Sequence, residues 1–427
     1  MIRILKQGEI PDAEILARTL PQTAVADTVA EILAAVRAEG DAALRRFCAQ
    51  FDGGAPESLR VTEAEMEEGL AAVEPELRDV LERAAENIRA FHRRQVRNSF
   101  LVNETPGVLA GQKVLPIERV GLCVPGGAAP LASTVLMDAI PAKLAGCRML
   151  VVVTPAGADG KISPAVLTAA HIAGVDQIFK LGGAQAIAAL PYGTESVPRV
   201  DKIVGPGGAF VSEAKRQVYG QVSIDMIAGP SEILVVADAG SDARCVAADL
   251  LSQAEHDRMA SAVLVTDSPA LAKAVQREIE TQLAALPRQD IARESIEKNG
   301  KIILTADIPA AIQIANALAP EHLELCVDAP FDYLDAVKNA GSVFLGRSCP
   351  EALGDYFAGV NHTLPTSGTA RFSSPLSVDD FVHKMQFTYY TEDALRAVSA
   401  DVAAFARAEK LDGHARSVLV RTEEGTR

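Results

Sequence analysis

The chain has 427 residues, a formal net charge of −15, and 48% hydrophobic and 23% charged residues, as expected of a globular protein with two or three domains. It lacks tryptophan and has only 4% aromatic residues. Base stacking and attraction to a phosphate backbone are therefore both disfavoured, and a small molecule is the expected partner rather than nucleic acid. Its six cysteines are scattered, its N-terminus lacks a long apolar stretch and it has no run of about 18 apolar residues, so we expect a cytoplasmic protein without disulfides, secretory signal or membrane span.

The first part of the chain is expected to be helical. After a short N-terminal segment, Asp27 opens a helical pattern and places an acid in the first turn, where it suits the positive end of the helix dipole. Residues 63–97 continue this periodicity as one long helix or two in succession. Their charged residues are those of a solvated face, which indicates a scaffolding role.

From about residue 118, strands and helices alternate in two series. The first series has strands at 120–124, 149–154, 177–181, 201–204, 222–225 and 233–237, with helices near 132–146 and 163–174 and after Gly182-Gly183. The second has strands at 262–266, 301–305, 323–327 and 342–345, with helices near 242–257 and 308–318. Such alternation predicts parallel βαβ units. Two series predict two α/β units of similar design.

The chain is expected to end in a small helical piece from about residue 377. Residues 403–409 have a helical pattern, and Asp412-Gly413 is expected to end that helix.

Three glycine-rich turns give only weak phosphate-binding signals. Gly205-Pro206-Gly207-Gly208 opens a helix and could offer backbone N–H groups to an anion. However, Phe210 stands where a Gly-x-Gly-x-x-Gly fingerprint has its third glycine, and such a sequence alone is more often a tight turn. Pro125-Gly126-Gly127 and Gly229-Pro230-Ser231-Glu232 are similar. All three are expected at the strand ends where α/β sheets open their crevice.

Gln253 and His256 lie three residues apart late in an expected helix, so their side chains share one face. Farther along, Asp355 follows Gly354 and His414 follows Gly413, at backbone-permissive positions that suit loop-held ligands or ordinary turns. This assortment would suit a borderline cation such as Zn²⁺. A Gln-x-x-His pair alone is more often an ordinary helix surface, but five of the seven histidines fall from His256 onward, and this accumulation favours a site.

Glu321 and His322 follow Pro320 and precede an apolar strand. A histidine can act as a base near neutral pH, and a neighbouring glutamate could activate water or tune the histidine. Adjacent side chains of an extended chain point to opposite faces, so both reach one site only if the chain bends here. A solvated pair at a helix end is the alternative.

Eight stretches, in order along the chain, carry a resemblance to one family. They are Arg119–Leu122, Pro125-Gly126-Gly127, Gly183–Leu190, Gly193–Pro198, Ile224–Glu232, Ser252–His256, Pro320–Glu324 and Asn361–Thr366. Through them the chain resembles the histidinol dehydrogenase family over essentially its whole length.

The resemblance implies a zinc-dependent oxidation of L-histidinol to L-histidine in two NAD-dependent steps through a bound aldehyde, which is the last step of histidine biosynthesis. It implies that His322 removes the hydroxyl proton as hydride leaves for NAD⁺. Glu321 would then activate water to hydrate the aldehyde, and His322 would serve again as base. A captive aldehyde is not released, and one base at fixed geometry can serve both steps.

The resemblance also implies a set of ligands for metal and substrate. One Zn²⁺ per subunit would be held by Gln253, His256, Asp355 and His414 and would orient the substrate. Ser231 and Glu409 would contact the substrate, beside His322 and the metal ligands. His362, in a family motif, is a further pocket candidate. Family members are homodimers in which Glu409 and His414 would complete the site of the other subunit.

For the fold, the resemblance implies two Rossmann-like α/β domains, one of them discontinuous, with small N-terminal and C-terminal helical segments. We expect an N-terminal segment at 1–20, a first α/β domain at 21–122 plus 232–376, a second at 123–231, and a C-terminal segment at 377–427 that reaches the dimer partner.

Two residues depart from the family pattern at the cofactor site, which Cys123, Gln185 and Gly208 are expected to line. Family members usually carry Tyr at the position of Cys123 and Asn at the position of Gly208. The chain therefore lacks a large ring with its hydroxyl and an amide that could bind the cofactor. We expect weaker NAD binding, whereas every implied zinc and acid–base residue is present.

Two other interpretations stay open. One is a paralogous dehydrogenase of another small polar alcohol. The other is a non-catalytic zinc-binding or metabolite-binding protein that has lost NAD. Retention of Glu321, His322, Glu409 and His414 favours histidinol over another alcohol, because these residues would recognise and process an amino alcohol. It also disfavours a non-catalytic protein, because a degenerate pocket should have lost its acid–base residues as well.

Overall fold

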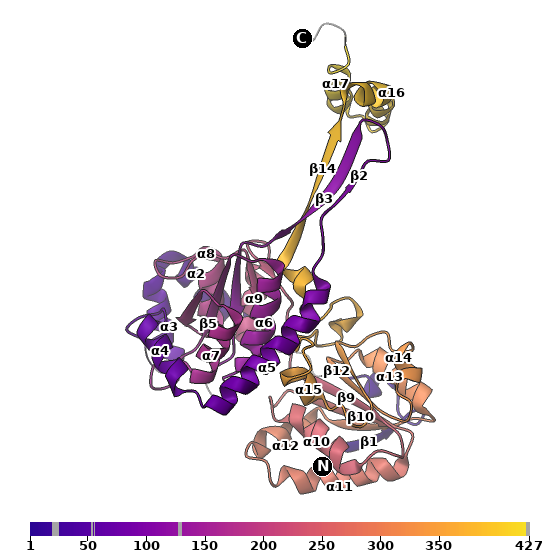
Figure 1. The fold of residues 1–427 in the computed structure, drawn as a ribbon. Helices are drawn as coiled ribbons and strands as arrows, with labels where there is room; N and C mark the ends of the chain where they lie inside the picture. The colour runs from indigo at the N-terminus through magenta and orange to yellow at the C-terminus, as the bar shows by residue number, and fades with distance from the viewer. Residues whose placement is uncertain (19–24, 53, 55, 127–129, 424–427) are drawn as a thin grey trace. The chain divides into compact units, whose positions relative to one another are not determined.

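The structure, a computed structural model, describes residues 1–18, 25–52, 54, 56–126 and 130–423 (Figure 1). Two compact units are present: Met1–Gln95 with Ile117–Phe381, and Val96–Pro116 with Val382–Arg427. Gly127 of the expected turn and the expected domain boundary at residue 20 lie outside the described residues. Within the described ranges, no helix is long and apolar enough to cross a membrane.

The first unit contains a five-stranded parallel sheet in the order β6-β5-β4-β7-β8. Its strands are β4 (Arg119–Cys123), β5 (Met149–Thr154), β6 (Gln177–Lys180), β7 (Lys202–Val204) and β8 (Ser223–Ile224). The connecting helices are α6 (Ala132–Ala145), α7 (Pro164–Ala173), α8 (Gly183–Tyr192) and α9 (Ala209–Val218). Apolar clusters lie on both faces of this sheet, as a parallel sheet requires.

The same unit contains a six-stranded parallel sheet in the order β1-β11-β10-β9-β12-β13. Its strands are β1 (Arg3–Lys6), β9 (Glu232–Ala237), β10 (Ser261–Thr266), β11 (Lys301–Leu304), β12 (His322–Cys326) and β13 (Ser342–Leu345). Its helices include α10 (Ala243–Ala254), α11 (Pro269–Leu283), α12 (Gln289–Lys298), α13 (Ile308–Leu318), α14 (Phe331–Leu334) and α15 (Glu351–Tyr356). The predicted α/β class is thereby confirmed.

Two expected domain memberships differ from the structure. The N-terminal helices α2 (Ala26–Glu39), α3 (Asp41–Phe51), α4 (Glu63–Ala72) and α5 (Pro75–His92) pack against α6 to α9 of the five-stranded sheet, not with residues 232–376 as expected. The reason is burial: the apolar side chains of α2 and α3 share one cluster with those of α8. Likewise residues 1–20 are not a separate helical segment, because β1 pairs in parallel with β11 and a short helix, α1 (Asp12–Ile15), follows it.

The second unit is built on a three-stranded antiparallel sheet in the order β14-β3-β2. Its strands are β2 (Phe100–Val102), β3 (Val108–Pro116) and β14 (Val382–Tyr390), and the helices α16 (Glu392–Ala408) and α17 (Asp412–Leu419) follow. The expectation of a purely helical segment at 377–427 was therefore wrong. Nine residues of β14 pair with residues of β3 that lie 266 to 282 positions earlier, and no local pattern marks that pairing. Asp412 begins α17 instead of ending a helix.

Candidate active site

His322 is the first residue of β12, between β9 and β13. Its Nδ1 lies 3.0 Å from the backbone oxygen of Glu232. A carbonyl can only accept, so Nδ1 carries the proton and Nε2 holds the lone pair of the neutral ring. Nε2 is buried, makes no hydrogen bond to any described residue and lies 3.5 Å from Asp355 Oδ1. The ring is thus oriented with its basic nitrogen toward Asp355.

Glu321 reaches the same place because the chain bends at this residue, as the sequence required. Its Oε2 accepts a hydrogen bond from the backbone N–H of Glu232 at 2.8 Å and lies 3.6 Å from His322 Nδ1. Burial raises the pKa of Glu321 to about 8. A carboxyl group with such a pKa can accept or return a proton close to neutral pH, as general acid–base chemistry needs.

Asp355 lies on α15, and its helix closely approaches β13 because residue 354 is glycine. A Cβ at Gly354 would lie 2.6 Å from the Phe344 ring. The sequence favoured a loop at this position, so the helical placement is a correction. Burial opposes ionisation of Asp355, but contact with His322 outweighs it and lowers the Asp355 pKa to about 2. Burial likewise opposes protonation of His322, but Glu321 and Asp355 raise its pKa to about 10.

Gln253 and His256 come from the end of α10, where Gln253 lies within the helix and His256 lies in the turn just after it. Gln253 is 1% exposed, and its Oε1 has no hydrogen-bond partner among the described residues. Part of His256 is exposed at the surface. Burial of the rest of the side chain lowers the pKa of His256, and the charges of Asp355 and His322 also act on this pKa. The structure therefore places His256 in the neighbourhood of His322 and Asp355, which lie 3.5 Å apart.

Two members of this cluster were missed or left open by the sequence. Glu351, one turn before Asp355, has an oxygen within 4.8 Å of ligand atoms of His322 and Asp355 and accepts the Ser252 hydroxyl at 2.9 Å. Its spacing of four from Asp355 was the available signal. His362 Nδ1 lies 3.1 Å from the Asp355 backbone oxygen, and its Nε2 lies 3.2 Å from Thr134 Oγ1 on α6.

The donor set suits a divalent cation. Imidazole, carboxylate and amide oxygen are ligands that Zn²⁺ accepts, and the unpartnered buried Gln253 Oε1 is an acceptor without a donor. Ser231, just before β9, is half-buried beside Glu232 and belongs to the same region. Glu409 and His414 are exposed residues of the second unit, at the end of α16 and within α17.

This cluster lies at the amino ends of β9 and β12, whereas ligands of open α/β sheets usually bind beyond the carboxyl ends. The Gly229-Pro230-Ser231-Glu232 turn enters β9, so the expectation that it opens a carboxyl-edge crevice was wrong. The chemistry lies there because Glu232 and His322 are the first residues of β9 and β12, and Glu321 directly precedes β12.

The cofactor candidates lie instead at the carboxyl edge of the five-stranded sheet. Cys123 ends β4 and is buried, Gln185 lies in the first turn of α8, and Gly208 caps α9 after β7. The strands β5 and β6 lie on one side of β4, and β7 lies on its other side. The strand order therefore reverses between β4 and β7, which is where ligands of open α/β sheets usually bind. The glycine at position 205 allows the chain after β7 to lie close to the end of β4, because a Cβ there would lie 2.2 Å from the Cys123 carbonyl oxygen.

Gln185 has a partner that the sequence did not indicate. Its Nε2 donates to Asp52 Oδ2 at 3.3 Å. Burial raises the pKa of Asp52.

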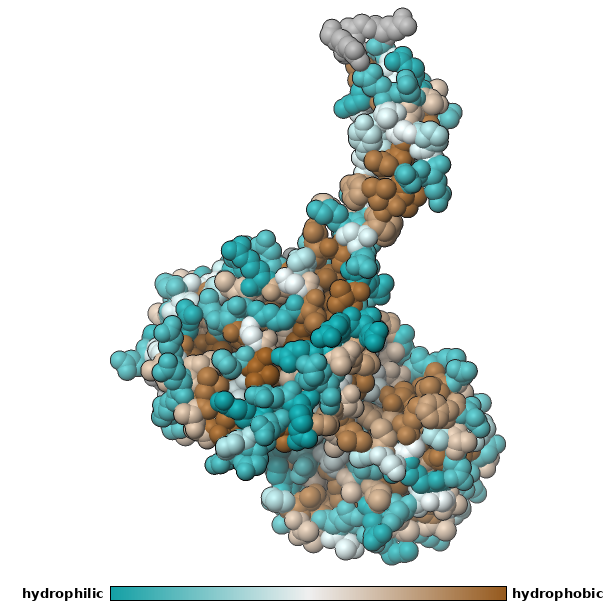
Figure 2. Space-filling model, in the orientation of Figure 1, coloured by the Kyte–Doolittle hydropathy of each residue, from teal (hydrophilic) through white to brown (hydrophobic). Residues whose placement is uncertain are grey.

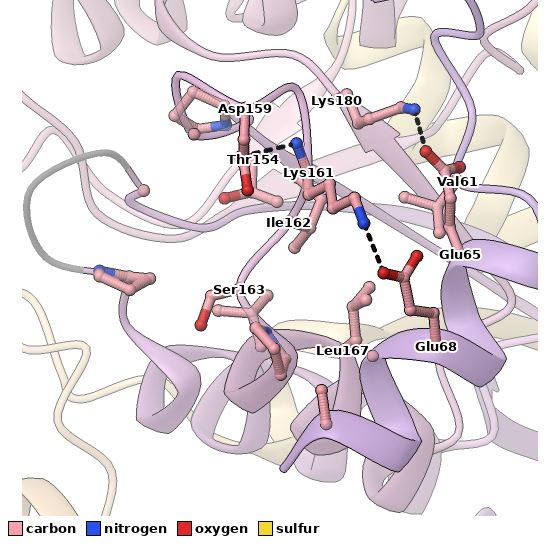
Figure 3. A pocket seen from close by; sticks show the side chains of 18 residues that line it. Val61, Glu65, Glu68, Thr154, Asp159, Lys161, Ile162, Ser163, Leu167 and Lys180 are labelled. Carbon is pink, nitrogen blue, oxygen red and sulfur yellow. Dashed lines mark hydrogen bonds and ion pairs between the residues drawn. The ribbon is translucent and has the colours of Figure 1, made fainter.

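A cavity of about 260 Å³ lies beside the five-stranded sheet, between α4 and α7 (Figure 3). Thr154 and Pro155 after β5 line it, with Lys180, which pairs with Glu65 at 2.6 Å. None of Cys123, Gln185, Gly208 or the acid–base residues is among its lining residues. The cavity is therefore separate from the chemistry at β12.

Comparison with known proteins decides the family. The family model for histidinol dehydrogenase matches residues 17–422. The chain belongs to the histidinol dehydrogenase family. The chain is therefore an oxidoreductase of this family, which confirms the prediction from the eight matching stretches.

Named relatives support this assignment over the full chain. The histidinol dehydrogenase of Syntrophotalea carbinolica is 52% identical over 406 residues, which cover 95% of this chain and 94% of the relative. That of Bacillus cereus ATCC 10987 is 52% identical over 423 residues, covering 99% and 96%. The crystal structure of histidinol dehydrogenase from Elizabethkingia anophelis superposes with a TM-score of 0.92 at 38% identity, covering 98% of each chain.

Proposed function

We propose that this chain oxidises L-histidinol to L-histidine through a bound aldehyde, with one Zn²⁺ per subunit, as the final step of histidine biosynthesis. The overall reaction consumes one L-histidinol, two NAD⁺ and one water, and yields histidine, two NADH and three protons. The observation that carries the proposal is the orientation of His322, whose Nδ1 is fixed by the Glu232 carbonyl while its buried Nε2 makes no hydrogen bond to any residue that the structure describes.

His322 Nε2 is the atom that accepts the proton of the substrate hydroxyl. Its neighbour Glu321, buried and bonded to the Glu232 N–H, accepts a proton from the water that hydrates the aldehyde. After its first proton has passed to solvent, His322 accepts the proton of the hydrate. NAD⁺ supplies the hydride acceptor in both steps, and Cys123, Gln185 and Gly208 are the residues proposed to border it.

Gln253, His256 and Asp355 would hold the metal from this unit, with Ser231 beside the substrate. A bound divalent cation would polarise and orient the substrate, and its charge would oppose protonation of His322, bringing that pKa down toward the range of a base. In its absence the charges of Glu321 and Asp355 keep the His322 pKa high.

We infer further that the protein is a homodimer in which Glu409 and His414 complete the site of the other subunit. The second unit supports this. Residues 383–390 of β14 are all exposed, and because successive side chains of a strand point to opposite faces, both faces of this strand are open to a partner. Its exposed apolar side chains include Phe100, Leu101, Phe387, Tyr389 and Phe405, and Figure 2 shows brown, hydrophobic surface on this unit. Apolar surface of this kind marks an interaction site.

The proposed reaction is tested by its stoichiometry. Purified zinc-loaded protein with excess NAD⁺ should form two NADH per L-histidinol consumed, with histidine as the product and loss of turnover after chelation. One NADH per alcohol, or turnover only with other polar alcohols, would contradict the proposal and favour a paralogous dehydrogenase. Absence of NAD binding by calorimetry would favour a non-catalytic protein.

The two departures at the cofactor site give a second test. Gly208→Asn should lower the KM for NAD⁺ without loss of stability, because a Cβ at Gly208 meets nothing within 4 Å. Cys123→Tyr should also lower this KM, but Cys123 is only 6% exposed, so the larger ring is expected to cost about 1–3 kcal/mol of stability. Gly208→Ala is the matched control, since it fills the space without an amide. An unchanged KM in both variants would refute the role of these positions.

A further inference from the structure

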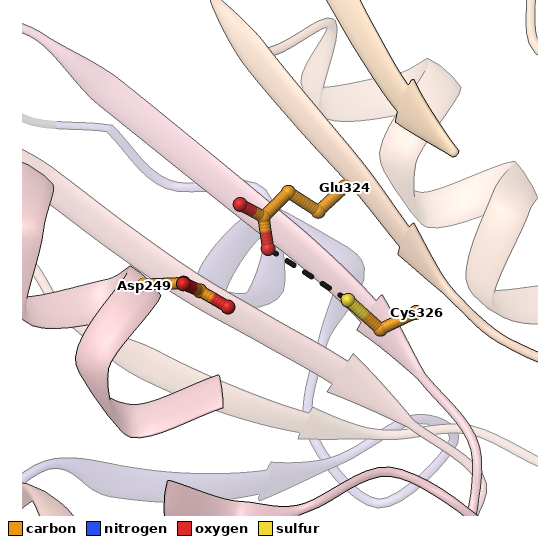
Figure 4. A group of neighbouring side chains, drawn as sticks. All are labelled: Asp249, Glu324 and Cys326. Carbon is orange, nitrogen blue, oxygen red and sulfur yellow. Dashed lines mark hydrogen bonds between the residues drawn. The ribbon is translucent and has the colours of Figure 1, made fainter. Parts of the chain in front are cut away.

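A second polar cluster is formed by Asp249, Glu324 and Cys326 (Figure 4). Glu324 and Cys326 of β12 and Asp249 of α10 have ligand atoms that all lie within 4.8 Å of one another. Glu324 is fully buried, and its Oε2 accepts the Cys326 thiol at 3.8 Å. Neither the acid–base roles nor the metal ligands described above include any of these three residues.

Glu324 and Asp249 carry carboxyl oxygens within 4.8 Å of each other, so that a proton on either group could bridge the pair. Burial raises the pKa of Glu324 to about 9 and that of Asp249 to about 6. The pair therefore keeps a proton at neutral pH, and the two groups attract each other instead of repelling.

Glu324 lies on β12, bonds to α15 and lies close to Asp249 of α10, and these three elements carry His322, Asp355 and Gln253. It lies two residues after His322 on β12, so both side chains face the same side of the sheet. Its Oε1 accepts the backbone N–H of Glu351 at 2.7 Å, in the first turn of the helix that carries Asp355. Its partner Asp249 lies one turn before Gln253 on α10.

We propose that Glu324 is a positioning residue that joins α10, β12 and α15, and thereby holds Gln253 and His256 in register with Asp355 for binding a divalent cation. The inference rests on the proposed metal site. Partners behind the ligands of a metal fix their orientation, and their loss typically lowers metal affinity by about 10- to 100-fold. The cluster itself is not assigned as a cation site, because the Cys326 thiol already donates to Glu324 and burial favours the protonated form of Glu324.

The test compares two substitutions of similar length in the full chain. Glu324→Gln can keep both links, since its amide oxygen can accept the Glu351 N–H and its amide NH₂ can donate to Asp249. Glu324→Met fills the space but makes neither bond. Zinc dissociation constants are measured by competition with a chromogenic chelator, and the melting temperature of the metal-free protein is measured alongside.

We expect Glu324→Met to weaken zinc binding by about 10- to 100-fold and Glu324→Gln to bind zinc nearly as the native protein does. The control is Thr266→Val, which removes a buried hydroxyl that accepts the Ser268 N–H at the far end of β10. It should lower the melting temperature without changing the zinc affinity. Native affinity in Glu324→Met, equal losses in the Met and Gln variants, or two zinc ions per native subunit would each overturn the inference.

Should Glu324→Met fail to fold, Asp249 provides the same comparison at a half-buried position. Asp249→Leu should weaken zinc binding and Asp249→Asn should retain it, because only Asn can still bond to Glu324. Native-like affinity in Asp249→Leu would then overturn the inference. A native protein that binds no zinc would instead refute the proposed metal site, so the two failures are distinguishable.

Discussion

His322→Asn should lower kcat for L-histidinol oxidation by about 100- to 10,000-fold, the range that one positioned general base contributes. The substitution is well matched to the site. An asparagine amide can still donate to the Glu232 carbonyl, as His322 Nδ1 does at 3.0 Å, but it has no nitrogen that accepts a proton. Stopped-flow measurement of NADH formation under saturating substrates gives kcat directly.

The control for this prediction is His171→Asn, a substitution on the exposed end of α7 in the other lobe. It should leave kcat unchanged. Native kcat in a folded His322→Asn protein would remove His322 from its proposed role.

Glu321→Gln should slow oxidation of the aldehyde more than oxidation of the alcohol, because only the aldehyde must be hydrated.

Mixing two inactive variants should restore activity if each site is shared between subunits. Subunits with His322→Asn and subunits with His414→Asn are each expected to be inactive alone. After exchange, half of the dimers of a symmetric protein contain both kinds of subunit, and each has one site with both native histidines. Activity should therefore reach about one quarter of the native value per subunit.

The measurement is NADH formation after denaturation of the mixture and joint refolding, with each variant refolded separately as the control. Mixed dimers are identified by a tag on one variant. Mixed dimers that form without recovered activity would show that His322 and His414 act within one subunit. Activity of the His414→Asn protein refolded alone would show that His414 is not required.

The alternation of short apolar strands with helices was readable without a fold. Strands were predicted at 149–154 and 342–345, and the structure has them at those residues. Their type follows from local composition, because strands buried on both faces are continuous apolar runs. The strand β14 was missed, since all but one of its residues are exposed and its partner β3 lies far away in the chain.

Glu321, His322 and Asp355 were identifiable as candidates from their residue types and flanking residues, and the motifs in order along the chain identified the family. The sequence determined which side chains are available for proton transfer and metal binding. Only the tertiary structure decided which of them meet. The orientation of His322 depends on the Glu232 carbonyl, 90 residues away, and its neighbour Asp355 comes from another helix. Glu351 and Glu324 acquire significance the same way, because buried polar atoms are set by their spatial partners, and no local pattern encodes partners so distant along the chain.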